Sequence, residues 1–361
     1  MSSPHPALLQ LAIRGEAGPI ADEDAFVASV SEHRMVSNVT AAIDSGAIQL
    51  SPEAGVTLGM RDLAEWHRHI GFWKTIRRTE AALEEFGVGA AVIKGVATEA
   101  RWYDGIGDRV CTDVDLFLDP GALDNAADIV EQLDPKRGSK SAIEWLVIRR
   151  LLQHVDLRIG STQVDLHFDP LKLGVPTVQI DEVWKSTETI ETDQGSIRVL
   201  RAEIELVLLL LHLNKDRFAF LGSLLDIPRI LQRAALDWDY LQEFVAGEGL
   251  DVPVWNSLAS VAEVLSLTVD IPRPKGFRSL MWQRLWARHR MLGGYEGRQA
   301  APTVQRMLPF HLKNRSSDVA REIRRQVMPP RQLVEVAGQL EADRSYFRYL
   351  ILDRFRANAL P

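Results

Sequence analysis

The first part of the chain places apolar residues with the period of an α-helix. From about Asp22 to Phe86 they recur at helical spacing. The members on or near one stripe are Leu63, Trp66, Ile70, Trp73, Ile76 and Leu83. The pattern stops at Gly87 and Gly89, which are typical of a helix end. We therefore expect residues 1–88 to form an N-terminal helical region.

From residue 90 the period shortens to that of a β-strand. Residues 91–93 form a short β-prone run that ends in Lys94-Gly95, and residues 96–103 follow with a helical pattern. Residues 114–118 alternate in polarity as a strand does. Asp119-Pro120 then predicts a helix start, with Asp119 as the N-cap and proline at the first position.

Two further segments predict a β-hairpin. Residues 155–159 and 164–168 both alternate, and Gly160-Ser161-Thr162 lies between them. A last strand is expected at residues 196–200. Residues 89–200 are thus predicted to be a mixed α/β unit, so we expect an α+β fold with a small mixed sheet between helical regions.

The remainder, residues 201–361, is predicted to be a C-terminal helical domain. Helical spacing marks residues 203–215, 224–235 and 240–246, and residues 332–359 are strongly amphipathic. Residues 273–314 are rich in Arg, Trp and Pro and predict no clear element. The longest apolar run, Leu206 to Leu211, is far shorter than the roughly 20 residues that span a bilayer.

Composition narrows the class of protein. The 361 residues include 46% hydrophobic and 25% charged residues, which is globular rather than disordered composition. The net charge of −7 argues against a non-specific polynucleotide binder. A single cysteine, Cys111, excludes a disulfide framework and a four-cysteine zinc site. With no basic, apolar leader at the start, we expect a cytoplasmic protein.

The strongest chemical signal lies in the strand that contains Asp113 and Asp115. Residues two apart on a strand point to the same face, whereas Val114 and Leu116 point to the other. Adjacent like charges are costly without a partner, and a divalent cation such as Mg²⁺ satisfies carboxylate oxygens. The alternative is a solvated strand edge with two acidic residues, and the spacing alone leaves both open.

The neighbouring segments favour the metal-site hypothesis. The turn at Lys94 enters a predicted helix, where backbone N–H groups and the lysine charge suit a phosphate. Asp165, His167 and Asp169 share one face of a later strand. A strand–turn–helix, a two-aspartate strand and a third strand carboxylate form the layout of a two-metal phosphoryl-transfer site.

These motifs together resemble the bacterial group of uncharacterised nucleotidyltransferases within the polymerase-β-like nucleotidyltransferase superfamily. The resemblance covers roughly residues 60–235. The matching segments are Ile93-Lys94-Gly95, Arg109, Asp113-Val114-Asp115-Leu116, Val164-Asp165-Leu166-His167, His212-Leu213-Asn214-Lys215 and Leu225-Asp226-Ile227. Lys94-Gly95 stands where the superfamily usually has a Gly-Ser turn, which is a departure from the pattern.

The resemblance implies a role for each matching residue of the core. Asp113 and Asp115 would hold Mg²⁺ or Mn²⁺. Asp165 would be the third carboxylate, as a metal ligand or as the base facing the acceptor. Asp156 is a rival for that third position, because residues 155–157 also fit a hydrophobic–acid–hydrophobic strand.

A second set of residues would bind the nucleotide. Lys94, Gly95, Arg109 and Lys215 would contact the triphosphate, and His167 would stabilise Asp165 or touch substrate. Arg109 could instead form a salt bridge that fixes the Asp113 loop, and Lys215 could be a solvated charge at a helix end.

Three nearby residues have simpler interpretations. We expect Cys111 to be a small buried hydrophobe. His212 is expected to be a satisfied core or interdomain histidine, and Asp226 a structural partner of Lys215 or Arg229.

The sequence therefore predicts a metal-dependent nucleotidyltransferase. It would move a nucleoside monophosphate from an NTP, with ATP as the default, to a hydroxyl or phosphate of a small molecule, peptide or protein. Pyrophosphate would be released. Neither a membrane nor a nucleic acid is the expected partner. The alternative is a non-catalytic nucleotide- or protein-binding member that acts as a toxin–antitoxin-like or scaffolding component.

Overall fold

A computed structural model of the chain describes residues 4–135, 154–171, 177, 179–216 and 218–283. Within them, four helices precede the first strand. They are α1 (Pro6–Arg14), α2 (Glu23–Glu32), α3 (Val36–Asp44) and α4 (Pro52–Glu84). The expected N-terminal helical region is confirmed for the described residues. The amphipathic segment 332–359 and most of 273–314 lie outside them.

The long helix α4 differs from its sequence prediction in the face that it buries. Leu63 and Trp66 are 49% and 43% exposed, although both were on the predicted stripe. Trp73, Ile76 and Leu83 of that stripe are buried as predicted, and in the first half of the helix Leu58 is buried instead. The reason is that the first half of α4 covers α2 and α3, and only its second half reaches the sheet.

The centre of the molecule is a six-stranded mixed sheet in the order β3-β4-β2-β1-β6-β5. Its strands are β1 (Ala90–Ile93), β2 (Val114–Leu118), β3 (His154–Ile159), β4 (Thr162–His167), β5 (Glu188–Ile190) and β6 (Ile197–Val199). β2 pairs in parallel with β4, and β1 in parallel with β6; the other neighbours are antiparallel. The predicted α+β class and the β3–β4 hairpin are confirmed, whereas β5 was missed.

Short helical elements connect the strands. Lys94 leads β1 into α5 (Gly95–Trp102), as predicted. Asp119 caps the next element through its side chain, with Pro120 first, but the chain forms a 3₁₀ turn, η1 (Pro120–Asn125), before α6 (Ala126–Leu133) begins. A further short helix, α9 (Ile180–Lys185), precedes β5.

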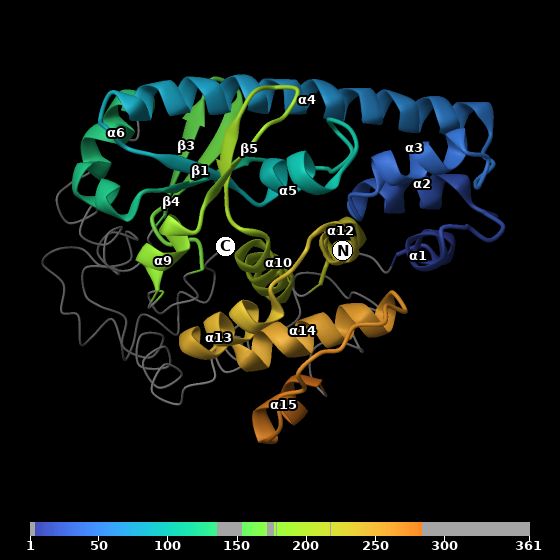
Figure 1. Cartoon of the computed structure of the whole chain (residues 1–361). Helices are drawn as coiled ribbons and strands as arrows, with labels where there is room; N and C mark the ends of the chain where they lie inside the picture. Colours follow the sequence, from blue (N-terminus) through green and yellow to red (C-terminus); the bar gives the residue numbers. More distant parts are fainter. Residues whose placement is uncertain (1–3, 136–153, 172–176, 178, 217, 284–361) are drawn as a thin grey trace, which may run out of the picture.

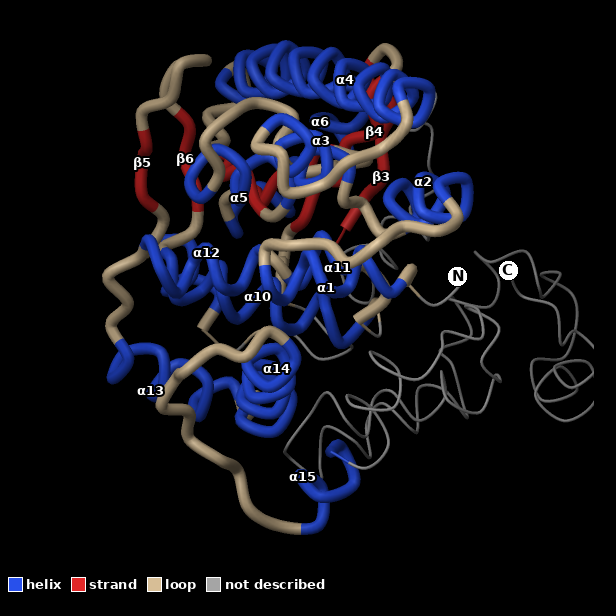
Figure 2. Tube along the Cα trace, turned by 90° about the vertical axis from the view of Figure 1, so that its right-hand side faces the viewer, coloured by secondary structure: helices blue, strands red, loops and turns tan. Residues whose placement is uncertain are grey.

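Helices cover the two faces of the sheet differently (Figures 1 and 2). α4 and α6 pack on one face over side chains such as Val114, Leu116 and Leu166, which are fully buried. Below the other face lie α10 (Ala202–Lys215) and α12 (Asp226–Arg233), followed by α13 (Trp238–Glu248) and α14 (Asp251–Val264). Phe117 joins this second core, where its ring meets Trp184 edge-on at 5.4 Å.

The helices after the sheet are more broken than the periodicity predicts. The expected helix at 224–235 is divided into α11 (Leu221–Leu224) and α12, and α14 and α15 (Phe277–Trp282) were not predicted. Pro253 lies in the first turn of α14, where proline is tolerated. No helix among the described residues is long and apolar enough to cross a membrane.

Candidate functional site

A row of carboxylates crosses one face of the sheet. Asp115 on β2 is the register partner of Asp165 on β4, and Asp165 is the partner of Asp156 on β3. Residues in register on neighbouring strands project from the same face. The sequence left Asp156 and Asp165 as rivals; the sheet sets them side by side, with Asp165 between Asp115 and Asp156. Asp156 is the outer member and is half exposed, with 51% of its side chain accessible.

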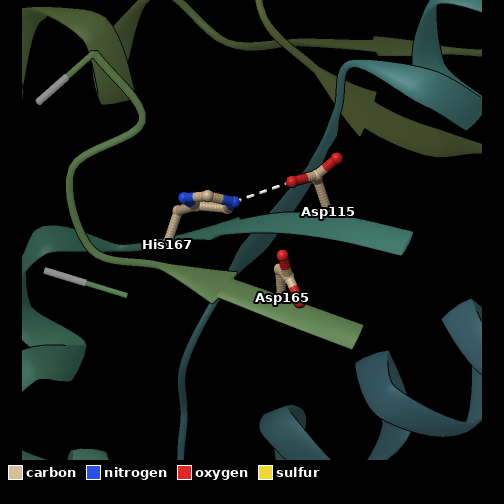
Figure 3. Close-up of side chains that lie close together, drawn as sticks. All are labelled: Asp115, Asp165 and His167. Carbon is tan, nitrogen blue, oxygen red and sulfur yellow. Dashed lines mark hydrogen bonds and ion pairs between the residues drawn. The ribbon is translucent and has the colours of Figure 1, made fainter. Parts of the chain in front are cut away.

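Asp115 is the innermost member of this row, at the end opposite Asp156, and is nearly enclosed. One of its oxygens, Oδ1, accepts a hydrogen bond from Lys94 Nζ at 2.7 Å and lies 2.7 Å from His167 Nε2 (Figure 3). Burial raises the pKa of Asp115, but the Lys94 ammonium and His167 outweigh it and hold that pKa well below its usual range. Asp115 is therefore ionised at any pH at which the protein works.

His167 completes the centre as a neutral imidazole. It lies two residues after Asp165 on β4 and therefore shares its face. Burial and the nearby Lys94 charge lower the pKa of His167 to about 4, against the attraction of Asp115. Its ring stacks on that of His154, with centroids 6.1 Å apart. At neutral pH the ring nitrogens are available as one donor and one acceptor.

Asp165 and Asp113 lack a comparable cationic partner in the described part of the chain. Asp165 accepts a hydrogen bond from Gln163 Nε2 at 3.1 Å, and Asp113 accepts one from Thr112 Oγ1 at 3.1 Å. Burial and the charges of Asp115, Asp156 and Asp113 raise the pKa of Asp165 to about 6. Burial and Asp115 also raise the pKa of Asp113. The face therefore holds more negative charge than Lys94 alone neutralises.

This donor set suits a divalent metal ion. Among the described residues, ligand atoms of Asp115, Asp165 and His167 lie within 4.8 Å of one another. Asp113, which sequence placed among the ligands, stands outside that group, because β2 begins only at Val114. The raised pKa values of Asp165 and Asp113 are the physical sign of a shortage of positive charge, which a cation would correct.

Lys94 and Gly95 lie at the turn from β1 into α5, as the sequence predicts. Lys94 has a positive φ of 51°, a backbone strain typical of functional positions, and its ammonium binds Asp115. Gly95 begins α5 as a buried residue. A Cβ atom there would lie 3.2 Å from Cys111 Sγ, so glycine permits the close approach of α5 to the loop before β2.

Arg109 is held by a buried carboxylate. Its Nε and Nη2 donate to the two oxygens of Asp226, both at 2.9 Å, and Asp226 also accepts from the Tyr103 hydroxyl at 2.7 Å. The expected partners of Asp226 were Lys215 or Arg229, so that prediction was wrong. Arg229 instead stacks over Tyr103, 4.1 Å from the ring centroid. The Arg109–Asp226 pair ties the loop before β2 to α12.

The remaining predicted residues lie on α10 or in the core. Lys215 is exposed at the last turn of α10. His212 Nε2 lies 3.2 Å from Asp216 and is half-buried, not a core residue. Cys111 is buried, as expected, and contacts Arg109 Nη1 at 3.2 Å.

Comparison with known proteins assigns the family. The model of the uncharacterised nucleotidyltransferase family matches residues 19–266, so the chain belongs to that family. The crystal structure of an antigenic nucleotidyltransferase-like protein from Paracoccidioides brasiliensis is also similar. It is 14% identical with a TM-score of 0.33, over 55% of this chain and 93% of that one. No curated protein matches the chain.

Proposed function

We propose that this member of the nucleotidyltransferase family is a metal-dependent enzyme that transfers a nucleoside monophosphate from an NTP, ATP by default, to an acceptor. The observation that carries the proposal is the convergence of Asp115, Asp165 and His167 on one sheet face, with Asp113 and Asp156 adding negative charge. Asp115 and Asp165, with His167 or Asp113, would hold Mg²⁺ or Mn²⁺. When bound, the ion would neutralise the triphosphate and lower the pKa of an acceptor hydroxyl.

The chain's own residues would organise the transfer. Lys94 keeps Asp115 ionised and fixes its orientation through the 2.7 Å ion pair. Asp165, the register partner of Asp115 on β4, would accept the proton of the acceptor hydroxyl. The acceptor oxygen would then bond to the α-phosphorus as the bond to pyrophosphate breaks, and the proton would move to Asp165.

The resemblance also assigns roles in triphosphate binding, and these stay proposals. Lys94, Gly95, Arg109 and Lys215 would contact the triphosphate. For Arg109 this requires Nη1, which also contacts Cys111 Sγ, because Nε and Nη2 donate to the Asp226 carboxylate. The acceptor is proposed to be a small molecule, peptide or protein in the cytoplasm, and the acidic net charge disfavours a polynucleotide.

One observation favours a second function. Lys94 already neutralises Asp115 within the protein, as a cation would. A member that binds nucleotide or a protein partner without turnover, in a scaffolding or toxin–antitoxin-like role, would need no metal at this position. Turnover of a labelled NTP distinguishes the two functions, because only the enzyme would transfer the label.

The test is turnover of α-labelled NTPs with Mg²⁺ or Mn²⁺ and candidate acceptors. We expect label transfer and pyrophosphate release by the wild type, and losses of at least about 100-fold in Asp165→Asn and Asp113→Asn. Asp156→Asn, at the half-exposed end of the same row, should retain most activity, and Asp24→Asn on exposed α2 is the surface control. Metal-independent nucleotide binding without turnover would support the second function instead.

A further inference from the structure

Arg34 has an unusual backbone conformation between α2 and α3. Its φ is +59°, in the left-handed region that side chains other than glycine rarely adopt. The turn is held by a hydrogen bond from Met35 N to Val30 O at 2.9 Å and by one from Gly222 N to His33 O at 3.0 Å. A Cβ atom at Gly222 would overlap the Arg34 carbonyl oxygen. The backbone, and with it the direction of the Arg34 side chain, is therefore fixed from both sides.

Within the described part of the chain, the guanidinium of Arg34 has an aromatic contact and no direct counterion. It lies over the ring of Phe220, 3.8 Å from the centroid, and is half-buried. No carboxylate of the described residues lies within ion-pair distance of it. By contrast Arg109 is paired with Asp226 and Arg201 with Glu203. A partly desolvated, stacked guanidinium without a carboxylate is a ready donor for an external anion.

The surroundings place this donor beside the proposed transfer site. Arg34 and Arg109 line one small cavity together with Tyr103 and Ser223. Burial and the like charge of Arg109 lower the pKa of Arg34, and the charges of Asp216, at the end of α10, and Asp113, just before β2, oppose them. Arg34 therefore lies at the junction of the N-terminal helices, the loop before β2 and α10, on the Asp113 side of the carboxylate row.

We propose that Arg34 is a substrate-binding residue whose guanidinium binds a phosphate group of the nucleoside triphosphate. The inference rests on the proposed function and adds a contact from the N-terminal helices, which the sequence motifs do not include. The planar face of Arg34 is held by Phe220, so its N–H edge is oriented before the ligand arrives. A phosphate accepts hydrogen bonds from such an edge in bidentate fashion.

The experiment measures binding of ATP and of inorganic triphosphate, with Mg²⁺, by calorimetry. Arg34→Gln should weaken both by about 10- to 100-fold, the usual worth of hydrogen bonds between charged groups. Arg34→Lys keeps the charge and loses the planar fork, so an intermediate loss of about 3- to 10-fold is expected. The matched control is Arg201→Gln, because Arg201 also stacks on an aromatic ring, 3.6 Å from Tyr240, but is neutralised by Glu203; it should bind ATP as the wild type does.

The outcomes separate the inference from the proposed function. If the wild type neither binds nor turns over any NTP, the proposed function fails and the inference with it. If the wild type binds ATP and both Arg34 variants bind it equally well, the inference alone is wrong. If the Arg34 variants raise only the KM for the acceptor and bind ATP and triphosphate as the wild type does, the inference is also wrong, because Arg34 would then bind the acceptor. Urea unfolding confirms that the variants compared are folded.

Discussion

Asp165 illustrates how a proposed site residue can lower the stability of the folded state. Its carboxyl is half-buried beside Asp115, Asp113 and Asp156, and Gln163 is its only hydrogen-bond donor among the described residues. Burial and the three like charges raise its pKa to about 6, against roughly 3.9 in an unfolded chain. The folded state therefore holds the proton more tightly than the unfolded state.

Asp165→Asn should therefore stabilise the metal-free protein at neutral pH. Because the folded pKa is raised, the ionised form destabilises the native state above pH 6, and this cost fades as the pH falls through 6 towards 4. In EDTA at pH 7.5 we expect a gain of about 1–2 kcal/mol in the free energy of unfolding, shrinking at pH 4.5. Urea titration measures it. Asp24→Asn is the control, and equal destabilisation by Asp165→Asn at both pH values would contradict the prediction.

At the scale of elements, a buried ion pair joins α4 to α5. His69 Nδ1 lies 2.7 Å from Glu99 Oε2, and neither side chain is more than 3% exposed. The other Glu99 oxygen accepts hydrogen bonds from the backbone N–H groups of Gly107 and Arg109, at 2.9 and 3.1 Å. One carboxylate therefore positions the loop that leads to Asp113. Burial lowers the pKa of His69, but Cys111 and Glu99 outweigh it and raise the pKa to about 10.

The stabilisation by this pair should depend on pH in the alkaline range. A histidine whose folded pKa is raised stabilises the protein fully below its unfolded pKa of roughly 6.5, and the effect is lost as the pH rises towards 10. We expect the free energy of unfolding of the wild type to exceed that of His69→Gln by about 3 kcal/mol at pH 6.5 and by clearly less at pH 9.5. The measurement is urea unfolding at both pH values; a difference independent of pH would show that His69 is neutral in the fold.

A second buried ion pair, Arg109–Asp226, joins the loop before β2 to α12. Both side chains are nearly enclosed, with 12% and 1% exposed. Arg109→Met or Asp226→Leu alone should lower the free energy of unfolding by about 3–5 kcal/mol, because each leaves a buried charge unpaired. The double variant should be less destabilised than the sum. A double-mutant cycle by urea unfolding measures this coupling, and strict additivity would contradict it.

At the scale of the whole molecule, the site depends on contact between regions far apart in sequence. Leu221 of α11 belongs to the apolar cluster of α1–α4, which also contains Phe26 and Leu58. The neighbouring Gly222 packs against the backbone of Arg34. Figure 2 shows α11 beside α1, at the junction of the two helical regions. Residues of the predicted N-terminal and C-terminal helical regions thus pack in one apolar cluster.

Gly222→Ala should disturb the contact between α11 and the α2–α3 turn, and through it the position of Arg34. The added Cβ overlaps backbone rather than a flexible side chain, so α11 and the α2–α3 turn must separate. We expect a loss of about 1–3 kcal/mol in stability and weaker ATP binding, because Arg34 moves with the turn. Gly59→Ala on α4 is the matched control, since a Cβ there meets nothing within 4 Å and alanine favours helix. Calorimetry and urea unfolding measure the two effects; unchanged ATP affinity in a destabilised Gly222→Ala would contradict the link.

Local patterns in the sequence determined much of the core. Alternation over Val114–Leu118 and in the hairpin strands predicted β2, β3 and β4. The same alternation placed Asp165 and His167 on one face, because side-chain direction in a strand follows from the period alone. The turn at Lys94 and the α+β class could likewise be predicted, since each depends on residues that are neighbours in the sequence.

Only the tertiary structure decided which distant residues meet. Strand order and register set Asp115 beside Asp165, direct Lys94 onto Asp115 and leave Asp113 outside the tight cluster. The partner of Arg109 and the position of Arg34 had no signal in sequence, because they depend on how α11 and α12 pack against the first helices. Periodicity fixes the face on which a side chain lies, whereas contacts between faces follow from packing of the whole chain.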